Sequence, residues 1–491
     1  MGQRRGVGAR RGGGAIPKRR AAAMLAAALA LPGCSTLQSV QRTFLGGPAG
    51  AASGEPVRLR GFIGAAVADE PRAALAGREL LALGGTAADA AVAVGMTLAV
   101  TLPSRAGLGG GGACLAYDPR RSGPGAGRPE AILFLPVPPA APGANADRPA
   151  SVPMLARGLF LLQSRYGTQQ FETLIAPAER LARLGTEVSR TLAADIALVA
   201  APLSADPNAR AIFTPNGQPL AAGATLVQAD LGATLAQLRT GGVGELYQGG
   251  LGSRFVQGAQ VAGGGLQLDD LRRALPTSAA PLVLPAGRDQ VAFLPPPADG
   301  GLAAAVAFRA LRADPGDVGA AQAAALSAVS RWRAGGVTVA AALAQPAGGA
   351  PLPALPASTS FVTLDRTGMA VACAVTMDNL FGTGRVAPGT GIVLAASPRA
   401  VPVPLLAAAI AWNDSLHAFR AEIAGSGQAG AGLAVADGIA NALAGRSPMP
   451  QPVPDPGRAN AIACWRYLPD NDGTCGWAAD PRETGIAAAG N

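Results

Sequence analysis

The chain has 491 residues, 49% of them apolar, which is enough to bury a large core and excludes a wholly disordered protein. Its formal net charge is +9, but residues 1–33 carry seven basic side chains and no acid, so the +2 that remains gives no support for nucleic-acid binding. Because Lys18 is the only lysine and His417 the only histidine, a multi-histidine metal site and a lysine-centred phosphate loop are excluded from the body of the chain, and no metal or cofactor is expected.

Residues 1–33 are predicted to be an export signal, because basic positions are followed by an apolar run at 21–32 that is too short to span a membrane. The small residue before Cys34 resembles a bacterial lipobox, in which the cysteine becomes the lipidated first residue of the mature chain. Ordinary signal cleavage is the alternative. Ser35 favours the outer membrane, so we expect a lipid anchor on the periplasmic face of a bacterial membrane. Residues 34–58 are then a linker.

The segment 59–357 is expected to be mainly helical. Periodic apolar positions predict helices at 70–83 and 87–100, and Thr86 between them can cap the second helix. The elements expected after them are strands at 113–118 and 131–135, a mostly helical stretch at 151–261, a strand at 288–294, a helix at 300–311 and a linker rich in Pro, Ala and Gly at 341–357.

The segment 358–491 is predicted to be a run of strands. Alternating apolar positions at 358–364 and 369–376 predict a hairpin. The elements expected after it are strands at 393–394, 405–412 and 419–423, a turn at 425–430 and a last helix at 431–443. Long helices, then a linker, then strands that begin abruptly at a hydroxyl residue form an unusual order.

Four cysteines lie beyond the proposed anchor. Cys464 and Cys475 flank a predicted turn, so in an oxidising compartment they are expected to form a disulfide. Cys114 and Cys373 lie inside apolar runs, and the expectation for both is a buried, small hydrophobic side chain.

Ser358 directly follows the linker, which makes it a candidate N-terminal nucleophile. If the chain is cut before it, its own α-amino group, whose pKa lies near neutrality, can accept the hydroxyl proton. The competing interpretation is a solvated strand edge. Thr359 is the rival nucleophile, but strand alternation points it to the opposite face of the sheet.

Several motifs, in order along most of the mature chain, resemble the γ-glutamyltranspeptidase family. Residues 84–93 read Gly-Gly-Thr-Ala-Ala-Asp-Ala-Ala-Val-Ala, and residues 107–112 are similar to the family's glycine-rich turn. The most specific block is 358–365 followed by the Phe-Gly-Thr-Gly at 381–384. There the family begins with a Thr that is both autoprocessing residue and nucleophile. The resemblance implies an α+β fold, a four-layer αββα sandwich of the N-terminal nucleophile hydrolase type.

The same resemblance implies that 59–357 and 358–491 are the large and small fragments of one intertwined domain. Ser358 stands where the family has its Thr nucleophile, and Thr376 keeps the hydroxyl that supports the new N-terminal residue. We therefore expect the chain to cut itself between Ala357 and Ser358.

The implied substrate pocket departs from the family pattern. Asp378 replaces an asparagine, Ser397 begins the segment where the family has two acids, and Leu135 falls on the arginine that clamps the substrate carboxylate. Gln428 and Ala429 fall on the glycine pair whose amides form the oxyanion hole, a role that needs N–H groups rather than particular side chains.

Three functions fit these observations. The first is a self-processing amidohydrolase or acyltransferase whose substrate differs from simple γ-glutamyl amides. The second is authentic glutathione hydrolysis, with the clamp supplied by Arg157, Arg385 or Arg399. The third is a lipid-anchored pseudoenzyme with a binding or scaffold role. The expected partners are a small amide or peptide substrate, the two fragments themselves and a membrane through the anchor, with no nucleic acid.

Three other residues carry weaker expectations. His417 lies in a predicted turn and is expected at the surface. Asp89 is expected to be buried with a structural role, because it lies on an apolar helix face. Arg105, in the loop before the glycine run, is expected to be solvated.

Overall fold

The computed structural model describes residues 61–122, 126–141, 146–344, 357–446 and 453–490, which belong to one compact unit. The predicted export signal, Cys34 and the linker at 34–58 lie outside the described residues, as do residues 345–356 of the second linker. Within the part that is described, no helix is both long and apolar enough to cross a bilayer.

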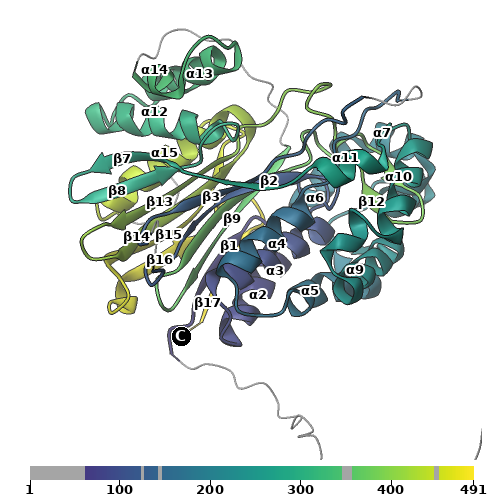
Figure 1. Ribbon diagram of the computed structural model, residues 1–491, viewed down its shortest axis with the longest axis horizontal. Coiled ribbons are helices and arrows are strands. Elements are labelled where there is room, and N and C mark those ends of the chain that lie inside the picture. The colour runs from purple at the N-terminus through teal and green to yellow at the C-terminus, as the bar shows by residue number, and fades with distance from the viewer. Residues whose placement is uncertain (1–60, 123–125, 142–145, 345–356, 447–452, 491) are drawn as a thin grey trace, which may run out of the picture. The chain divides into compact units, whose positions relative to one another are not determined.

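Two antiparallel sheets form the centre of the molecule (Figure 1). The strands of the first sheet, in spatial order, are β17 (Ile486–Gly490), β1 (Gly64–Ala68), β9 (Ser358–Asp365), β10 (Ala370–Thr376), β2 (Gly111–Tyr117), β3 (Glu130–Phe134) and β6 (Thr277–Ala279). Those of the second sheet are β16 (Cys475–Ala478), β15 (Arg458–Leu468), β14 (Ala418–Ser426), β13 (Ala407–Asn413), β8 (Asp289–Phe293) and β7 (Leu282–Ala286). Each sheet therefore takes strands from both sides of residue 358.

Helices cover the outer face of each sheet. The first sheet lies under α2 (Pro71–Ala82), α3 (Ala87–Thr101) and α4 (Leu155–Tyr166), with α5 (Phe171–Leu184) packed on α3, and the second lies under α12 (Gly300–Ala313) and α15 (Ala431–Leu443). Three apolar clusters fill the interfaces between helices and first sheet, between the two sheets, and between second sheet and helices. The predicted four-layer αββα sandwich is confirmed.

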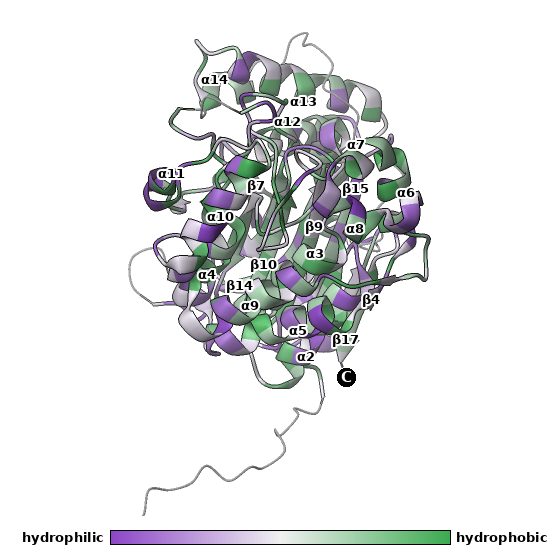
Figure 2. Cartoon of the chain, turned by 90° about the vertical axis from the view of Figure 1, so that its right-hand side faces the viewer, coloured by the Kyte–Doolittle hydropathy of each residue, from purple (hydrophilic) through white to green (hydrophobic). Residues whose placement is uncertain are grey.

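Further helices and short strands complete the fold. The helices are α6 (Arg190–Leu198), α7 (Ala200–Ala205), α8 (Pro207–Phe213), α9 (Ala229–Gly241), α10 (Gly250–Val261), α11 (Leu268–Arg273), α13 (Val318–Arg333) and α14 (Val339–Ala344), and the short strands are β4 (Thr186–Glu187), β5 (Thr225–Leu226), β11 (Val386–Ala387) and β12 (Ile392–Val393). Figure 2 shows polar residues on the outer helices α5 and α11, which are exposed to solvent on one side.

Helix α3 begins with a capping box. The Thr86 hydroxyl accepts from the Asp89 amide, and the Asp89 carboxylate accepts from the Thr86 amide. Asp89 is fully buried and also accepts from the backbone N–H groups of Thr168 and Gln169. Its predicted structural role is confirmed, because its carboxylate is saturated by the chain itself.

Two predictions about isolated polar residues have opposite outcomes. His417 lies exposed in the turn between β13 and β14, as expected. Arg105 is 6% exposed rather than solvated, so that prediction is wrong. Its guanidinium pairs with Asp195 on α6 and with Glu483, two acids far away in the sequence whose charges offset the cost of burial.

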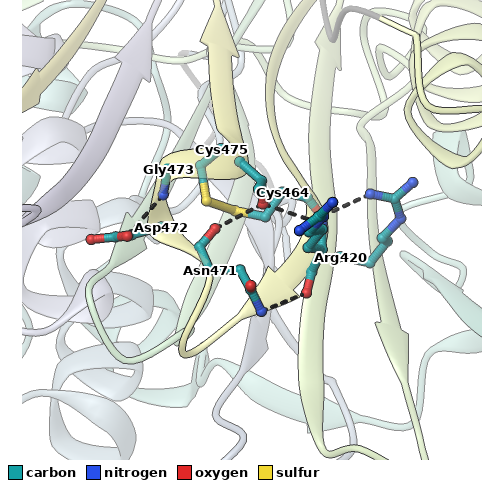
Figure 3. Close-up of a disulfide and its surroundings, with 8 residues drawn as sticks. Arg420, Cys464, Asn471, Asp472, Gly473 and Cys475 are labelled. Carbon is teal, nitrogen blue, oxygen red and sulfur yellow. Dashed lines mark hydrogen bonds between the residues drawn. A yellow bond between two sulfur atoms is a disulfide. The ribbon is translucent and has the colours of Figure 1, made fainter.

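The cysteines form two disulfides. Cys464 and Cys475 are bonded across β15 and β16, which confirms the predicted pair, and Arg420 donates to the Cys464 carbonyl beside it (Figure 3). Cys114 and Cys373 are also bonded, so the expectation of two isolated buried side chains is wrong. They lie directly opposite each other on β2 and β10, a pairing that a separation of 259 residues conceals in the sequence.

Candidate active site

Ser358 is the first residue of β9, a strand in the interior of the first sheet, and it is fully buried. The antiparallel register places Thr376, the last residue of β10, directly opposite it, and Gly111 of β2 opposite Thr376. The hairpin that alternation predicted therefore brings the two hydroxyl residues to the same end of the sheet. The sequence-predicted catalytic pair is together.

The carbonyl that precedes Ser358 is held by two donors. The Thr376 hydroxyl donates to the Ala357 oxygen at 2.6 Å, and the Met377 amide approaches the same oxygen at 3.4 Å. The Asp378 N–H donates to the Thr376 oxygen at 2.8 Å and so directs the hydroxyl hydrogen toward Ala357. Donors in this position stabilise negative charge that develops on the carbonyl oxygen when its carbon is attacked.

Gly427 supplies the hydrogen-bond donor at the candidate nucleophile. Its N–H donates to the Ser358 Oγ at 3.3 Å. Its φ of +91° favours glycine, and a Cβ there would lie 1.8 Å from the Pro456 carbonyl oxygen. Gln428 and Ala429, the predicted oxyanion positions, follow in a 3₁₀ turn ahead of α15, and no hydrogen bond between described residues joins either to Ser358. The amide that contacts the Ser358 hydroxyl belongs to Gly427, and the oxyanion role of Gln428 and Ala429 stays a prediction.

Asp69, which the sequence analysis missed, anchors the start of β9. Its carboxylate accepts from the Thr359 hydroxyl at 2.7 Å, from the Ser360 amide at 3.1 Å and from the Asn460 side chain at 2.7 Å. Burial raises the pKa of Asp69, and the nearby Glu483 carboxylate adds to this, while these three hydrogen bonds lower it. Thr359 is committed to Asp69, which leaves Ser358 as the hydroxyl beside Thr376.

Asp378 is a buried carboxyl group without a partner. Its side chain is 2% exposed, and neither carboxylate oxygen has a hydrogen bond within the described part of the chain. Burial raises its pKa to about 8, so the group is mostly neutral at pH 7. Its backbone adopts φ +61°, a left-handed conformation that Asp tolerates, and this turn aims its N–H at Thr376.

No hydrogen bond among the described residues joins the other predicted pocket residues to Ser358. Ser397 is buried, and its hydroxyl accepts from the Arg399 amide at 3.4 Å within a local turn. Leu135 is half-buried and offers no charge in place of the family's arginine.

None of the three alternative clamp residues bonds to the described site. Arg157 donates to the Leu271 carbonyl, Arg385 pairs with Asp147, and the exposed Arg399 donates to the Pro139 carbonyl. Of these, only Arg399 is exposed and without an ion pair among the described residues.

A cavity of about 380 Å³ lies in the loop that follows Thr376. Its walls are largely apolar and include Leu203, Leu380, Phe381 and Val401, with Asp147, Arg148 and Asn379 as polar members. The loop connects to the site through the Ala396 amide, which donates to the Met377 carbonyl. A mainly apolar group fits this space better than a doubly charged one.

A four-layer sandwich with a hydroxyl at the first residue of an inner strand, and donors on the carbonyl before it, defines the class of N-terminal nucleophile hydrolases. The gamma-glutamyltranspeptidase family profile matches residues 73–329, just over half of the chain, and the chain belongs to this family. That match ends before Ser358, so the candidate nucleophile rests on its own geometry.

Known relatives agree with this assignment. The glutathione hydrolase proenzyme of Escherichia coli is 34% identical over 258 residues, which are 50% of this chain and 44% of that protein, so the chain spans less than half of this relative's length. The crystal structure of cephalosporin acylase from Bacillus halodurans has a TM-score of 0.70 at 19% identity, covering 90% of this chain and 98% of that one. Helicobacter pylori gamma-glutamyltranspeptidase has a TM-score of 0.52 at 22% identity, covering 60% and 95%. At these identities the two structures show a shared fold.

Proposed function

We propose that the protein is a self-processing amidohydrolase or acyltransferase that uses Ser358 as its nucleophile. One observation carries this proposal: the Thr376 hydroxyl lies on the Ala357 carbonyl oxygen while the Gly427 N–H lies on the Ser358 Oγ. The bond to be cut and the atom that attacks it are thus both held by donors. A strand that merely starts with a serine has no need of either contact.

In the processing step, the Ser358 Oγ attacks the Ala357 carbonyl carbon. The new C–O bond replaces the C–N bond, and the hydroxyl proton ends on the released nitrogen, so an amide becomes an ester with a free α-amino group. Thr376 and the Met377 amide hold the carbonyl oxygen while it carries negative charge. Water then opens the ester, leaving a carboxylate on Ala357 and a free hydroxyl on Ser358.

In the steady-state reaction, the free α-amino group of Ser358 takes the hydroxyl proton as a substrate amide is attacked. The acyl group passes to Ser358, the amine leaves with that proton, and water or an acceptor amine removes the acyl group. Departure of Ala357 frees the donors of Thr376 and Met377 for this cycle. No histidine or lysine is needed, which agrees with the composition of the chain.

We further propose that the preferred substrate differs from γ-glutamyl amides such as glutathione. Leu135 provides no guanidinium for an α-carboxylate, and residues 397–400, which stand where the family has the acid pair that reads the α-ammonium group, contain no acid. The apolar cavity beyond Thr376 suits an uncharged acyl group. Authentic glutathione hydrolysis, with Arg399 as the clamp, is the second candidate because that exposed guanidinium has no ion pair among the described residues and is free to bind a carboxylate.

The test is to purify wild type, Ser358→Ala and Thr359→Ala and to measure the fragments by intact mass. We expect wild type and Thr359→Ala to yield a fragment that starts at Ser358, and Ser358→Ala to remain one chain. The processed enzyme is then compared on γ-glutamyl and neutral acyl p-nitroanilides, with the neutral substrate expected to be cleaved faster. A wild type that folds but stays one chain would establish the scaffold role of a lipid-anchored pseudoenzyme instead.

Export and anchoring through a lipid on Cys34 remain a separate proposal, supported by the basic start, the apolar run and the small residue before Cys34. The mature chain is expected in the membrane fraction of a bacterial host, and Cys34→Ala in the soluble periplasmic or unprocessed fraction. If Cys34→Ala distributes as the wild type does, the anchor is not at this cysteine.

A further inference from the structure

A second cavity, of about 660 Å³, lies at the opposite end of the sandwich from Ser358. Trp412, one of its lining residues, packs against Tyr117 at 6.2 Å between ring centroids. Tyr117 ends strand β2, whereas Gly111 at the start of β2 is opposite Thr376, so about 20 Å of strand separates the two sites. This cavity is therefore independent of the proposed catalytic chemistry.

The cavity exists because, at this edge, strand β7 of the second sheet is longer than strand β6 of the first sheet, which faces it. Leu282 and Leu284 of β7 pack toward helix α12, so strand alternation turns Val283 toward the first sheet. The facing strand β6 is only three residues long, and Val283 remains 46% exposed. An inner sheet face that would normally be covered is thus open to solvent, at the strands labelled β7 and β8 in Figure 1.

Three arginines surround this opening. Arg121 and Arg165 both bind Glu130, which also accepts from the Tyr166 hydroxyl. Burial raises the pKa of Glu130, but the bonds from Tyr166 and Arg165 outweigh burial and lower it, so the carboxyl is ionised and its acceptor capacity is already used. Arg128, the third arginine, is exposed and has no hydrogen bond or ion pair among the described residues.

The charges that line the cavity and its apolar surface together indicate which class of ligand fits it. The three guanidiniums face two carboxylates, Glu130 and Asp414, which leaves one positive charge. Val283 and Pro281 add an apolar wall, and the buried Trp412 forms the base. Behind it the Tyr117 hydroxyl is buried without a partner in the described structure. A guanidinium binds a carboxylate through two parallel hydrogen bonds, and an apolar wall binds a flat hydrocarbon ring.

We propose that this cavity is a binding site for an aromatic monocarboxylate, with Arg128 as the residue that receives the carboxylate and Val283 as part of the wall against which the ring packs. The single surplus charge matches a monoanion better than a phosphate dianion. The apolar wall favours a ligand that carries a flat ring as well as a negative charge.

The experiment is calorimetric titration of the full mature chain with three probes: naphthalene-2-carboxylate, its neutral isostere naphthalene-2-carboxamide, and acetate. We expect saturable binding of the carboxylate at submillimolar concentration, at least tenfold weaker binding of the carboxamide, and no detectable binding of acetate below 10 mM. Equal affinity for the two naphthalene probes, or no saturable carboxylate binding, overturns the proposal.

Variants locate the site. Arg128→Ala is expected to weaken carboxylate binding at least tenfold and Val283→Glu to abolish it, while Arg128→Lys retains part of it. Arg254→Ala, on the exposed face of α10, removes an equal charge elsewhere and serves as the control. Thermal unfolding and cleavage at Ser358 should match wild type in all of them. If Arg128→Ala and Arg254→Ala bind alike, the carboxylate is not held at this cavity.

Discussion

The hydroxyl of Thr376 is fixed by the Asp378 N–H on one side and by the Ala357 carbonyl on the other. It accepts from the Asp378 N–H and donates to the Ala357 oxygen. A hydroxyl has a single hydrogen, so occupation of its acceptor side decides where that hydrogen points. The conformation of Asp378, rather than the rotamer preference of Thr376, therefore sets the donor geometry at the junction.

Two replacements of Thr376 distinguish the role of its hydroxyl donor from the role of its side-chain shape. Thr376→Val keeps the shape but removes the donor, and we expect processing to slow by about 100-fold to 1000-fold, the usual cost of one oxyanion donor. Thr376→Ser keeps the hydroxyl and should process within about tenfold of wild type. The measurement is the rate at which the fragment starting at Ser358 appears by mass. A Thr376→Val chain that processes as fast as wild type would remove Thr376 from the mechanism.

Asp378 predicts a pH dependence of stability. Its native pKa of about 8 exceeds the ordinary 3.8, so between these values the folded state binds a proton that the unfolded state has lost. The contribution of this group to stability is thus complete below pH 3.8 and is lost progressively as the pH rises to about 8. Asp378→Asn does not titrate, so its advantage over wild type should grow across this window, to the order of 2–5 kcal/mol at pH 8.

Urea unfolding of wild type and Asp378→Asn from pH 5 to pH 9 measures this difference. The free energy gap between the two proteins should widen up to about pH 8 and then level off. A gap that stays constant over the whole range would mean that Asp378 is ionised in the folded protein throughout and would contradict its neutral state at pH 7.

At the scale of elements, the position of β9 depends on the residue that follows β1. The two strands pair along their length, and beyond the last pair the Asp69 carboxylate accepts from Thr359, Ser360 and Asn460. These donors come from the first and second sheets, so Asp69 joins the two layers at the catalytic end. The alignment of Ser358 with Thr376 relies on this buried contact.

Asp69→Ala leaves the buried Thr359 hydroxyl and Ser360 N–H without an acceptor and removes one of the acceptors of the Asn460 side chain. Each such group costs about 1–3 kcal/mol, so we expect a loss of about 3 kcal/mol or more in the free energy of unfolding and slower processing. Asp69→Asn retains one oxygen and should lose less. Denaturant unfolding gives the stability, and mass measurement gives the processing rate. Full stability in Asp69→Ala would show that water or neighbouring groups replace the carboxylate.

The sequence predicts the long elements better than the short ones. Helices α2 and α3 and the hairpin of β9 and β10 agree with expectation to within about two residues, because each has a sustained apolar period. Strands β6 and β7 were missed because β6 is three residues long and β7 contains a proline, which leaves little pattern.

The residues of the candidate site were also predicted where the sequence carries a pattern and missed where it carries none. Motif position predicts Ser358, Thr376 and Asp378, which occupy one hairpin and its adjoining turn. Asp69 and Gly427 come from β1 and β14, and their approach to Ser358 depends on sheet order and on packing between sheets. A single sequence carries no direct signal for either contact. For the same reason Arg105 was expected in solvent, since its partners Asp195 and Glu483 lie on other elements.

At the scale of the whole molecule, cleavage before Ser358 would divide the chain without dividing the fold. The first sheet interleaves β9, β10 and β17 with strands from before residue 358, and the second sheet combines β7 and β8 with four later strands. Separation of the fragments would expose both sheets and the apolar cluster between them. The two fragments should therefore copurify in native conditions, whether or not a covalent bond joins them.

The Cys114–Cys373 disulfide adds that covalent bond. Cys114 lies before residue 358 and Cys373 after it, on the paired strands β2 and β10. We therefore expect processed protein to run as one band on a denaturing gel without reductant and as two bands after reduction. Cys464–Cys475 lies wholly within 358–491 and cannot join the fragments, so Cys464→Ala/Cys475→Ala is the matched control. The double variant Cys114→Ala/Cys373→Ala should give two bands without reductant but still one peak in size exclusion. Wild-type fragments that part without reductant would show that these two thiols are unbonded in the mature protein.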